Sequence, residues 1–162
     1  MIPKNRERTI KVLGLLALGV YGWAGAFNPD YFLLLNGANL LFHEAGHVLF
    51  SFFGESISIW GGTLLQLLIP MGLAMAFCFK HEPVSASVMA WWFGQNFFGI
   101  SAYIKDARAQ ALPFVGGEQH DWEYILGAQG WLEYDQIAGN IVWFAGLLII
   151  TAAPAAGFIK RQ

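Results

Sequence analysis

The chain has 162 residues, of which 56% are hydrophobic and only 12% are charged, whereas soluble domains average roughly 25% charged residues. This composition indicates an integral membrane protein, and the length suits one membrane domain, residues 1–162, with no separate soluble module. The net charge of −2 gives no reason to expect nucleic acid as a partner.

Five stretches of the sequence are long and apolar enough to cross a lipid bilayer, which takes about 20 residues. They lie near residues 10–27, 31–53, 57–79, 84–104 and 137–159. The strict alternation of polar and apolar residues that is typical of β-strands is absent. We therefore expect an all-α fold, a polytopic transmembrane bundle of about five membrane-spanning helices.

The first stretch follows a basic N-terminal segment, "MIPKNRERTIK". Its apolar run is too long for a secretory signal and no small-residue cleavage site stands out, so we expect a retained helix. Basic segments stay in the cytoplasm, which places the N-terminus there. With five crossings, the loop of residues 105–136 is also cytoplasmic and Gln162 lies outside. We expect a multi-pass protein of the plasma membrane.

The second stretch contains "NLLFHEAGHVLFSFF", in which charged and imidazole side chains interrupt an apolar run. On a helix, His43 and His47 lie one turn apart on the same face, a spacing that lets two imidazoles bind one zinc ion. Glu44 lies on the flank of that face, where it can act as general base on a zinc-activated water. A charged side chain at mid-bilayer costs about 2.5–3.5 kcal/mol, so such a residue is functional by default. The alternative is that these side chains, with Asn36 and Asn39, hydrogen-bond neighbouring helices.

The run "HEAGH" in a membrane-spanning helix resembles the site-2 protease group of intramembrane zinc metalloproteases. The resemblance implies that His43 and His47 bind zinc, one ion per chain, that Glu44 is the catalytic base, and that Gly46 precedes the second ligand as is common in the family. It also implies transmembrane proteins or peptides as substrates. The family's aspartate motif, Asn-Pro-Asp-Gly or Leu-Asp-Gly, is missing downstream, and so is the PDZ-like domain of larger members. The similar run "NPDY" lies upstream, and we interpret it as a turn.

The third and fourth stretches carry polar side chains that are candidates for contacts with substrate or with an oxyanion. Gln66 lies in the third stretch, shortly after Gly61 and Gly62, which would let an extended substrate approach the backbone closely. Gln95 and Asn96 lie in the fourth. Amide groups of this kind can stabilise an oxyanion, and the alternative for each is an interhelical hydrogen bond.

A catalytic zinc site usually has three protein ligands, so a third ligand must come from elsewhere in the chain. His81 lies in the turn after the third stretch, on the outer side, and we exclude it. Asp106 is the preferred candidate, because it ends a helical face of polar and small residues and, like the family's aspartate, follows the HExxH helix by two crossings. His120 and Asp121, in "GGEQHDWEY", are the alternatives, although Asp121 could instead be the N-cap of a short helix.

These features together predict an intramembrane zinc-dependent endopeptidase that hydrolyses peptide bonds of membrane-embedded substrates. Water would reach the zinc ion from the cytoplasm. A helical substrate would have to unwind locally, because a helix hides its amides in hydrogen bonds. The alternatives are a non-proteolytic membrane protein with a structural metal site, and a carrier of metal ions or protons that uses His43 and Glu44.

Overall fold

The structure is a computed structural model that describes residues 4–112 and 119–158. These residues form six α-helices and three short 3-10 helices and contain no strand, which confirms the all-α class. In chain order the elements are α1 (Lys4–Phe27), η1 (Pro29–Phe32), α2 (Leu33–Phe50), η2 (Ser51–Phe53), α3 (Glu55–Phe79), α4 (Pro83–Lys105), α5 (Asp121–Ala128), η3 (Leu132–Tyr134) and α6 (Asp135–Ala156).

Three helical segments of the described chain are long and apolar enough to cross a membrane. They are Asn5–Phe27, Glu55–Phe79 and Leu132–Ala156, which correspond to α1, α3 and α6 with η3. The two other stretches predicted to cross, residues 31–53 and 84–104, do not reach the same apolarity, because polar side chains interrupt both. The structure therefore supports a membrane protein, while the number of five crossings stays a prediction.

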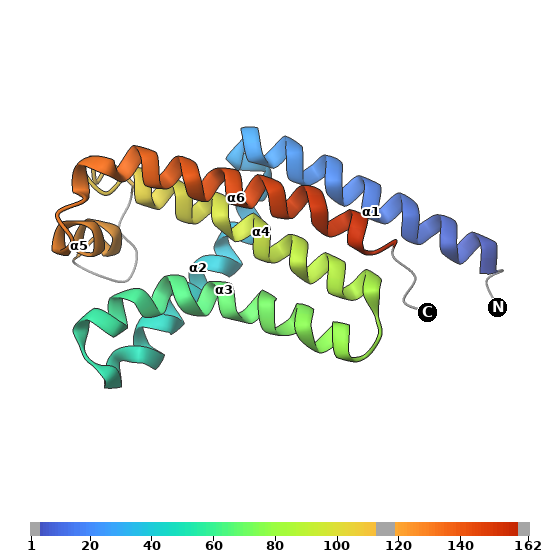
Figure 1. The fold of residues 1–162 in the computed structure, drawn as a ribbon, viewed down its shortest axis with the longest axis horizontal. Helices are drawn as coiled ribbons and strands as arrows, with labels where there is room; N and C mark the ends of the chain where they lie inside the picture. Colours follow the sequence, from blue (N-terminus) through green and yellow to red (C-terminus); the bar gives the residue numbers. More distant parts are fainter. Residues whose placement is uncertain (1–3, 113–118, 159–162) are drawn as a thin grey trace.

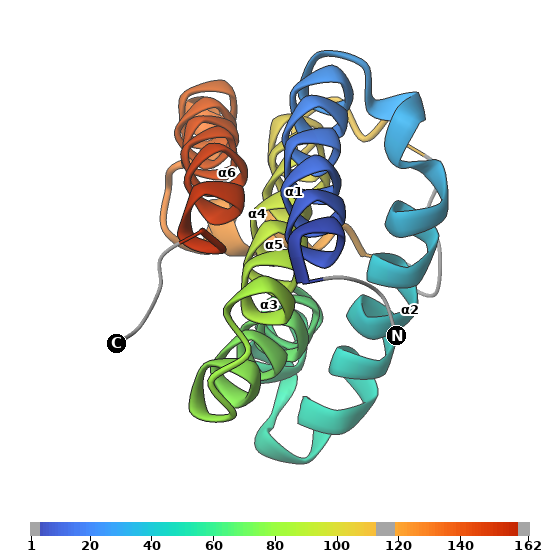
Figure 2. The ribbon, with the colours of Figure 1, turned by 90° about the vertical axis from the view of Figure 1, so that its right-hand side faces the viewer.

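The helices α1, α3, α4 and α6 run along the long axis of the molecule, and α2 lies obliquely to them (Figure 1). The start of α1, the turn between α3 and α4, and the end of α6 lie together at one end, which we call the terminal end (Figures 1 and 2). The helix α5, the end of α4 and the start of α6 lie at the opposite end, which we call the α5 end (Figure 1).

This arrangement differs from the predicted alternation of crossings. The prediction placed the N-terminus and the loop of residues 105–136 on one side of the membrane and the C-terminus on the other. In the structure the start of α1 and the helix α5 lie at opposite ends, and the start of α1 and the end of α6 share an end (Figure 1). The cause is α2, because an oblique helix does not carry the chain from one end of the bundle to the other.

The helix α4 occupies the centre of the bundle and packs most extensively against α6. Glycines allow the close approach, because a Cβ at Gly94 would lie 2.7 Å from Ile149, and one at Gly146 would lie 3.0 Å from the carbonyl oxygen of Gly94. Next to this contact, Phe32 of η1 stacks on Phe98 of α4 with ring centroids 5.8 Å apart. This close packing fixes the position of α4 relative to α6 and η1.

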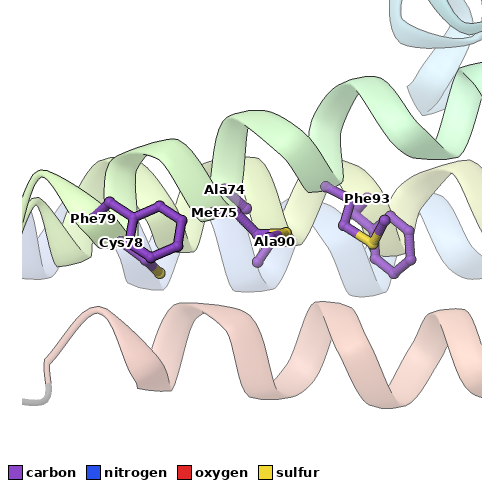
Figure 3. A pocket seen from close by; sticks show the side chains of 7 residues that line it. Ala74, Met75, Cys78, Phe79, Ala90 and Phe93 are labelled. Carbon is purple, nitrogen blue, oxygen red and sulfur yellow. The ribbon is translucent and has the colours of Figure 1, made fainter.

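The outer surface is strongly apolar. Leu34 is 91% exposed and Leu148 is 71% exposed, and many other large apolar side chains are similarly uncovered, as suits a surface that faces lipid. Near the terminal end, an apolar groove lies between α3 and α4. Its lining includes Ala74, Met75, Cys78, Phe79, Ala90 and Phe93 (Figure 3).

Candidate metal centre

The helix α2 presents both histidines of the HExxH run to α3. Their ring centroids lie 4.7 Å apart at an interplanar angle of 77°. The approach of the two helices depends on glycine, because a Cβ at Gly46 would overlap the carbonyl oxygen of Gly61. The predicted one-turn spacing thus places His43, which is buried, and His47, which is half-buried, side by side at the α2–α3 contact.

The carboxylate of Asp121, at the start of α5, reaches both imidazoles. Its Oδ2 lies 2.8 Å from Nε2 of His43 and 3.2 Å from Nε2 of His47. One ligand atom from each of these three residues lies within 4.8 Å of the other two. Burial alone would raise the pKa of Asp121, but hydrogen bonds with His43 and His47 outweigh it and hold that pKa below its ordinary value. The carboxylate is therefore ionised at neutral pH.

The second nitrogen of each imidazole faces an oxygen acceptor. Nδ1 of His43 lies 3.2 Å from Oε1 of Gln66, and Nδ1 of His47 lies 2.9 Å from the carbonyl oxygen of Ser58. The hydroxyl of Ser58 in turn donates to the carbonyl oxygen of His47, at 2.9 Å. When the hydrogen of each neutral ring is on Nδ1, these oxygen atoms accept it and each Nε2 presents a lone pair. Metal-binding histidines are oriented in the same way.

These contacts leave three electron-rich atoms facing one another. The Nε2 atoms of His43 and His47 and the Oδ2 atom of Asp121 converge, and in the neutral tautomers no hydrogen lies between them. In that tautomer a cation among the three atoms stabilises the group, either protons on the imidazoles or a metal ion. In a tetrahedral zinc site with bonds of about 2.0–2.1 Å, neighbouring ligand atoms lie about 3.3 Å apart, close to the spacing here.

A glycine keeps the space in front of the two imidazoles open. A Cβ at Gly62 of α3 would lie 2.6 Å from Nε2 of His47 and 2.7 Å from Nε2 of His43. Any other residue at this position would therefore press on the atoms that would bind a metal. The residues present thus fit a zinc ion in donor chemistry, in orientation and in available space.

Glu44 follows the first histidine and is half-buried. Within the described part of the chain its carboxylate makes no hydrogen bond or ion pair, although it lies close enough to His47 and Tyr103 to interact with both electrostatically. It stays outside the group of three ligand atoms. A carboxylate beside a metal centre, rather than in it, is positioned to accept a proton.

The structure does not bring Asp106, the preferred third ligand, to the two histidines. Asp106 follows the last residue of α4, and its carboxylate accepts hydrogen bonds from the backbone N–H groups of Ala111 and Leu112 at 2.9 and 3.0 Å. Its Oδ2 also lies 3.5 Å from Nε2 of His120. Asp106 therefore holds the chain where it leaves α4, and Asp121, one of the two alternatives, lies at the two histidines as the candidate third ligand.

His120 takes the helix-capping role that the sequence suggested for Asp121. Its Nδ1 accepts a hydrogen bond from the backbone N–H of Glu123 at 3.2 Å, which makes His120 the N-cap of α5. The side chain of Asp121 is thereby available to face α2. The alternatives His120 and Asp121 thus have separate roles, one at the cap and one at the candidate ligand position.

Tyr103 of α4 is a neighbour of the centre that the sequence did not single out. Its hydroxyl oxygen accepts a hydrogen bond from the backbone N–H of Asp121 at 3.3 Å, and its ring lies 4.1 Å from that of His120 and 5.9 Å from that of His43, centroid to centroid. Tyr103 follows Asn96 by seven residues and so lies on the same face of the helix. This spacing was the one feature of the sequence that could have indicated Tyr103 as a neighbour of the site. Tyr103 positions the start of α5 against α2.

The helix α5 is also held by contacts with α3. The rings of Trp60 and Trp122 pack edge to face with centroids 5.6 Å apart, and the hydroxyl groups of Ser56 and Tyr124 lie 3.0 Å apart. Apolar packing adds to these contacts, because Ile125 is buried and Leu126 lies in a buried cluster with Ile100, Ile104 and Ala107. Asp121 adds the contact of the start of α5 with the two histidines of α2.

The three predicted amide contacts have different surroundings. Gln66 faces His43 and orients its imidazole. Gln95 accepts from Asn39 at 2.8 Å and donates to Asn36 at 2.9 Å, which matches the alternative of an interhelical hydrogen bond. Asn96 donates to the carbonyl oxygen of Trp92 in its own helix, at 2.9 Å. Contacts of these residues with substrate stay predictions.

His81, which we excluded as a ligand, lies in the turn between α3 and α4 with φ of 58° and is exposed. This turn belongs to the terminal end, away from α5 (Figure 1). The apolar groove between α3 and α4 has no titratable side chain beyond Cys78 in its lining and is separate from the candidate centre (Figure 3).

Comparisons with family models, with curated proteins and with solved structures found no match for this chain. Two imidazole nitrogens and one carboxylate oxygen form a donor set that zinc takes in catalytic sites, where the fourth position is left open for water or substrate.

Proposed function

We propose that the chain is an intramembrane zinc endopeptidase, similar to site-2 proteases and lacking a PDZ-like domain, in the plasma membrane with its N-terminus in the cytoplasm. One observation carries the proposal: the lone pairs of His43 and His47 and the carboxylate of Asp121 converge next to the unengaged carboxylate of Glu44. In a structural zinc site protein ligands fill all four coordination positions. A site with three protein ligands leaves one position for water, and a neighbouring base can then accept the proton of that water during hydrolysis.

Different residues of the chain would bind the metal, orient its ligands and transfer the proton during hydrolysis. His43, His47 and Asp121 would hold the ion, and Gln66 and the carbonyl oxygen of Ser58 fix the orientation of the imidazoles. A bound zinc ion would supply Lewis acidity, which lowers the pKa of water to about 7. As the oxygen of water bonds to the carbonyl carbon, Glu44 accepts its proton, and it passes that proton to the amide nitrogen as the C–N bond breaks. The second proton of the water then passes from the new carboxylic acid to the amine, so the products are a carboxylate and an ammonium group.

The substrates would be transmembrane proteins or peptides. The candidate centre lies within a molecule whose outer surface is apolar, so a substrate reaches it through lipid or from the border of the bilayer. A helical segment must unwind before its amide can be attacked, because its backbone groups are otherwise engaged in hydrogen bonds. Segments with helix-breaking residues should therefore be cleaved first.

Replacement of the base tests the proposal. In Glu44→Gln the amide cannot accept a proton, so cleavage of a transmembrane test substrate should fall about 100-fold or more, while zinc content stays that of the parent. Glu55→Gln, a change of the exposed glutamate at the start of α3, is the matched control and should cleave at the parent rate. Cleavage by Glu44→Gln at the parent rate would overturn the mechanism, and a zinc-loaded parent that cleaves no test substrate would favour a structural metal site.

A further inference from the structure

The two ends of the bundle differ in charge. The terminal end carries Arg6, Arg8, Lys11 and Lys80, with Glu7 and Glu82. The α5 end carries only Lys105 and Arg108 as basic residues, and its acidic residues are Glu55, Asp106, Asp121, Glu123, Glu133 and Asp135. These comparisons hold for the described residues, and Lys160 and Arg161 lie outside them.

One of the two basic residues at the α5 end is already neutralised. Arg108 forms a two-pronged ion pair with Asp135, in which Nε lies 2.8 Å from Oδ2 and Nη2 lies 2.6 Å from Oδ1. The hydrogen bond with Asp135 raises the pKa of Arg108, so Arg108 stays positively charged and its charge is balanced by that of Asp135. Lys105 is then the basic residue of this end with no carboxylate partner of its own among the described residues.

Basic residues close to the ends of membrane-spanning helices favour the cytoplasmic side, and acidic residues contribute little to orientation. The sequence alone, with five alternating crossings, counted Lys105 and Arg108 together with the N-terminal basic residues. The observed arrangement separates them, because the oblique α2 places the start of α1 and the end of α4 at opposite ends (Figure 1). Basic residues therefore concentrate at the terminal end.

The candidate centre belongs to the other end. Asp121 starts α5, and the imidazoles of His43 and His47 contact its carboxylate. The side chain of His47 is 24% exposed, so the centre can be reached from outside the bundle.

We infer that the α5 end faces the extracytoplasmic side, and that the centre acts on transmembrane segments near their extracytoplasmic border. The second part rests on the proposed function, and the first does not. This orientation reverses the expectation that water reaches the centre from the cytoplasm. It keeps the N-terminus in the cytoplasm and places the C-terminus there as well.

Accessibility of single cysteines in intact cells tests the orientation. Cys78 is the one cysteine of the chain, so Cys78→Ser gives a background without thiols. In that background, Gln129→Cys at the end of α5 and Glu82→Cys in the α3–α4 turn are matched exposed positions at opposite ends. We expect a membrane-impermeant maleimide to label residue 129 in intact cells and residue 82 only after permeabilisation. The reverse pattern, or labelling of both in intact cells, would overturn the inference.

A reporter on the unchanged chain covers the case in which a cysteine variant does not fold. Alkaline phosphatase fused after Gln162 should be inactive and a fluorescent protein at the same point should be bright, since both would lie in the cytoplasm. An active phosphatase would contradict the orientation. Neither readout needs catalysis. A result that contradicts the orientation therefore does not contradict the proposed peptidase, and cleavage by Glu44→Gln does not contradict the orientation.

The substrate class is tested with two transmembrane test proteins that differ only in the place of an Asn-Pro pair. One carries the pair at the extracytoplasmic border of its membrane span and the other at the cytoplasmic border. We expect cells with the parent chain to cleave the first, and cells with Glu44→Gln to cleave neither. Cleavage of the second substrate alone would overturn the proposed substrate class.

Discussion

Gly62 of α3 lies directly against the imidazole of His47 of α2, so that a Cβ at Gly62 would come within 2.6 Å of Nε2. The same Cβ would come within 2.7 Å of Nε2 of His43. The absence of a side chain at one position of α3 therefore decides whether both imidazoles can share an ion. The sequence had suggested a different use for this glycine, the close approach of a substrate, which stays a prediction.

Gly62→Ala should abolish zinc binding, because the added methyl group presses on both ligand nitrogens. Gly72→Ala in the same helix, where a Cβ would meet nothing within 4 Å, should keep one zinc ion per chain. Alanine favours a helix over glycine by about 0.8–1.0 kcal/mol, so a loss of zinc in Gly62→Ala cannot come from a weaker α3. Elemental analysis of both purified variants checks this, and full zinc in Gly62→Ala would contradict the geometry.

Gln66→Leu should weaken zinc binding about 10–100-fold, because the Nδ1–H of His43 loses its acceptor and the imidazole loses its fixed orientation. Gln95→Leu is the matched comparison, since Gln95 joins α2 to α4 through Asn39 and Asn36. It should bind zinc as the parent does and lose about 1–2 kcal/mol of stability. Competition with a zinc-sensitive dye and thermal unfolding in detergent separate the two effects. Equal zinc affinities in Gln66→Leu and the parent would show that Gln66 has no role at the centre.

Removal of the metal should loosen α5, because Asp121 at its start would lose the ion that it shares with His43 and His47. Zinc at 100 times its Kd stabilises the form that binds it by about 2.7 kcal/mol, which corresponds to roughly a hundredfold change in the rate of amide exchange. Hydrogen exchange should therefore speed up in residues 122–128 on chelation, remain unchanged in α4, and recover when zinc is added back. An α5 that is equally protected with and without chelator would mean that zinc does not hold it.

The sequence predicted the features that depend on local pattern. The helical class and the one-turn spacing of His43 and His47 follow from local pattern, and the structure has both. Of the five predicted apolar stretches, three are found long and apolar enough to cross a membrane. Which residue becomes the candidate third ligand depends on the path that the chain takes from the end of α4 back to the two histidines. Asp106 and Asp121 both lie near the end of that helix, and the hydrogen bonds that turn Asp106 toward Ala111 and Leu112 leave no trace in periodicity.

For a similar reason, the sequence could not predict which helix ends lie together at each end of the bundle. The sequence predicts that residues 31–53 cross the membrane, which stays a prediction, and in the structure α2 lies obliquely to the other long helices (Figure 1). Its direction is set by contacts with other elements, such as the overlap that any side chain at Gly46 would make with Gly61. Contacts of this kind join residues far apart in the sequence, so a one-dimensional pattern does not encode them.

The zinc content of Asp121→Ala compared with Asp106→Ala is the most direct test of the centre. Both changes remove one carboxylate near the end of α4, and His120 rather than Asp121 caps α5, so neither removes that cap. We expect the parent and Asp106→Ala to carry one zinc ion per chain and Asp121→Ala to carry close to none. Full zinc in Asp121→Ala, or its loss in Asp106→Ala alone, would contradict a centre built from His43, His47 and Asp121.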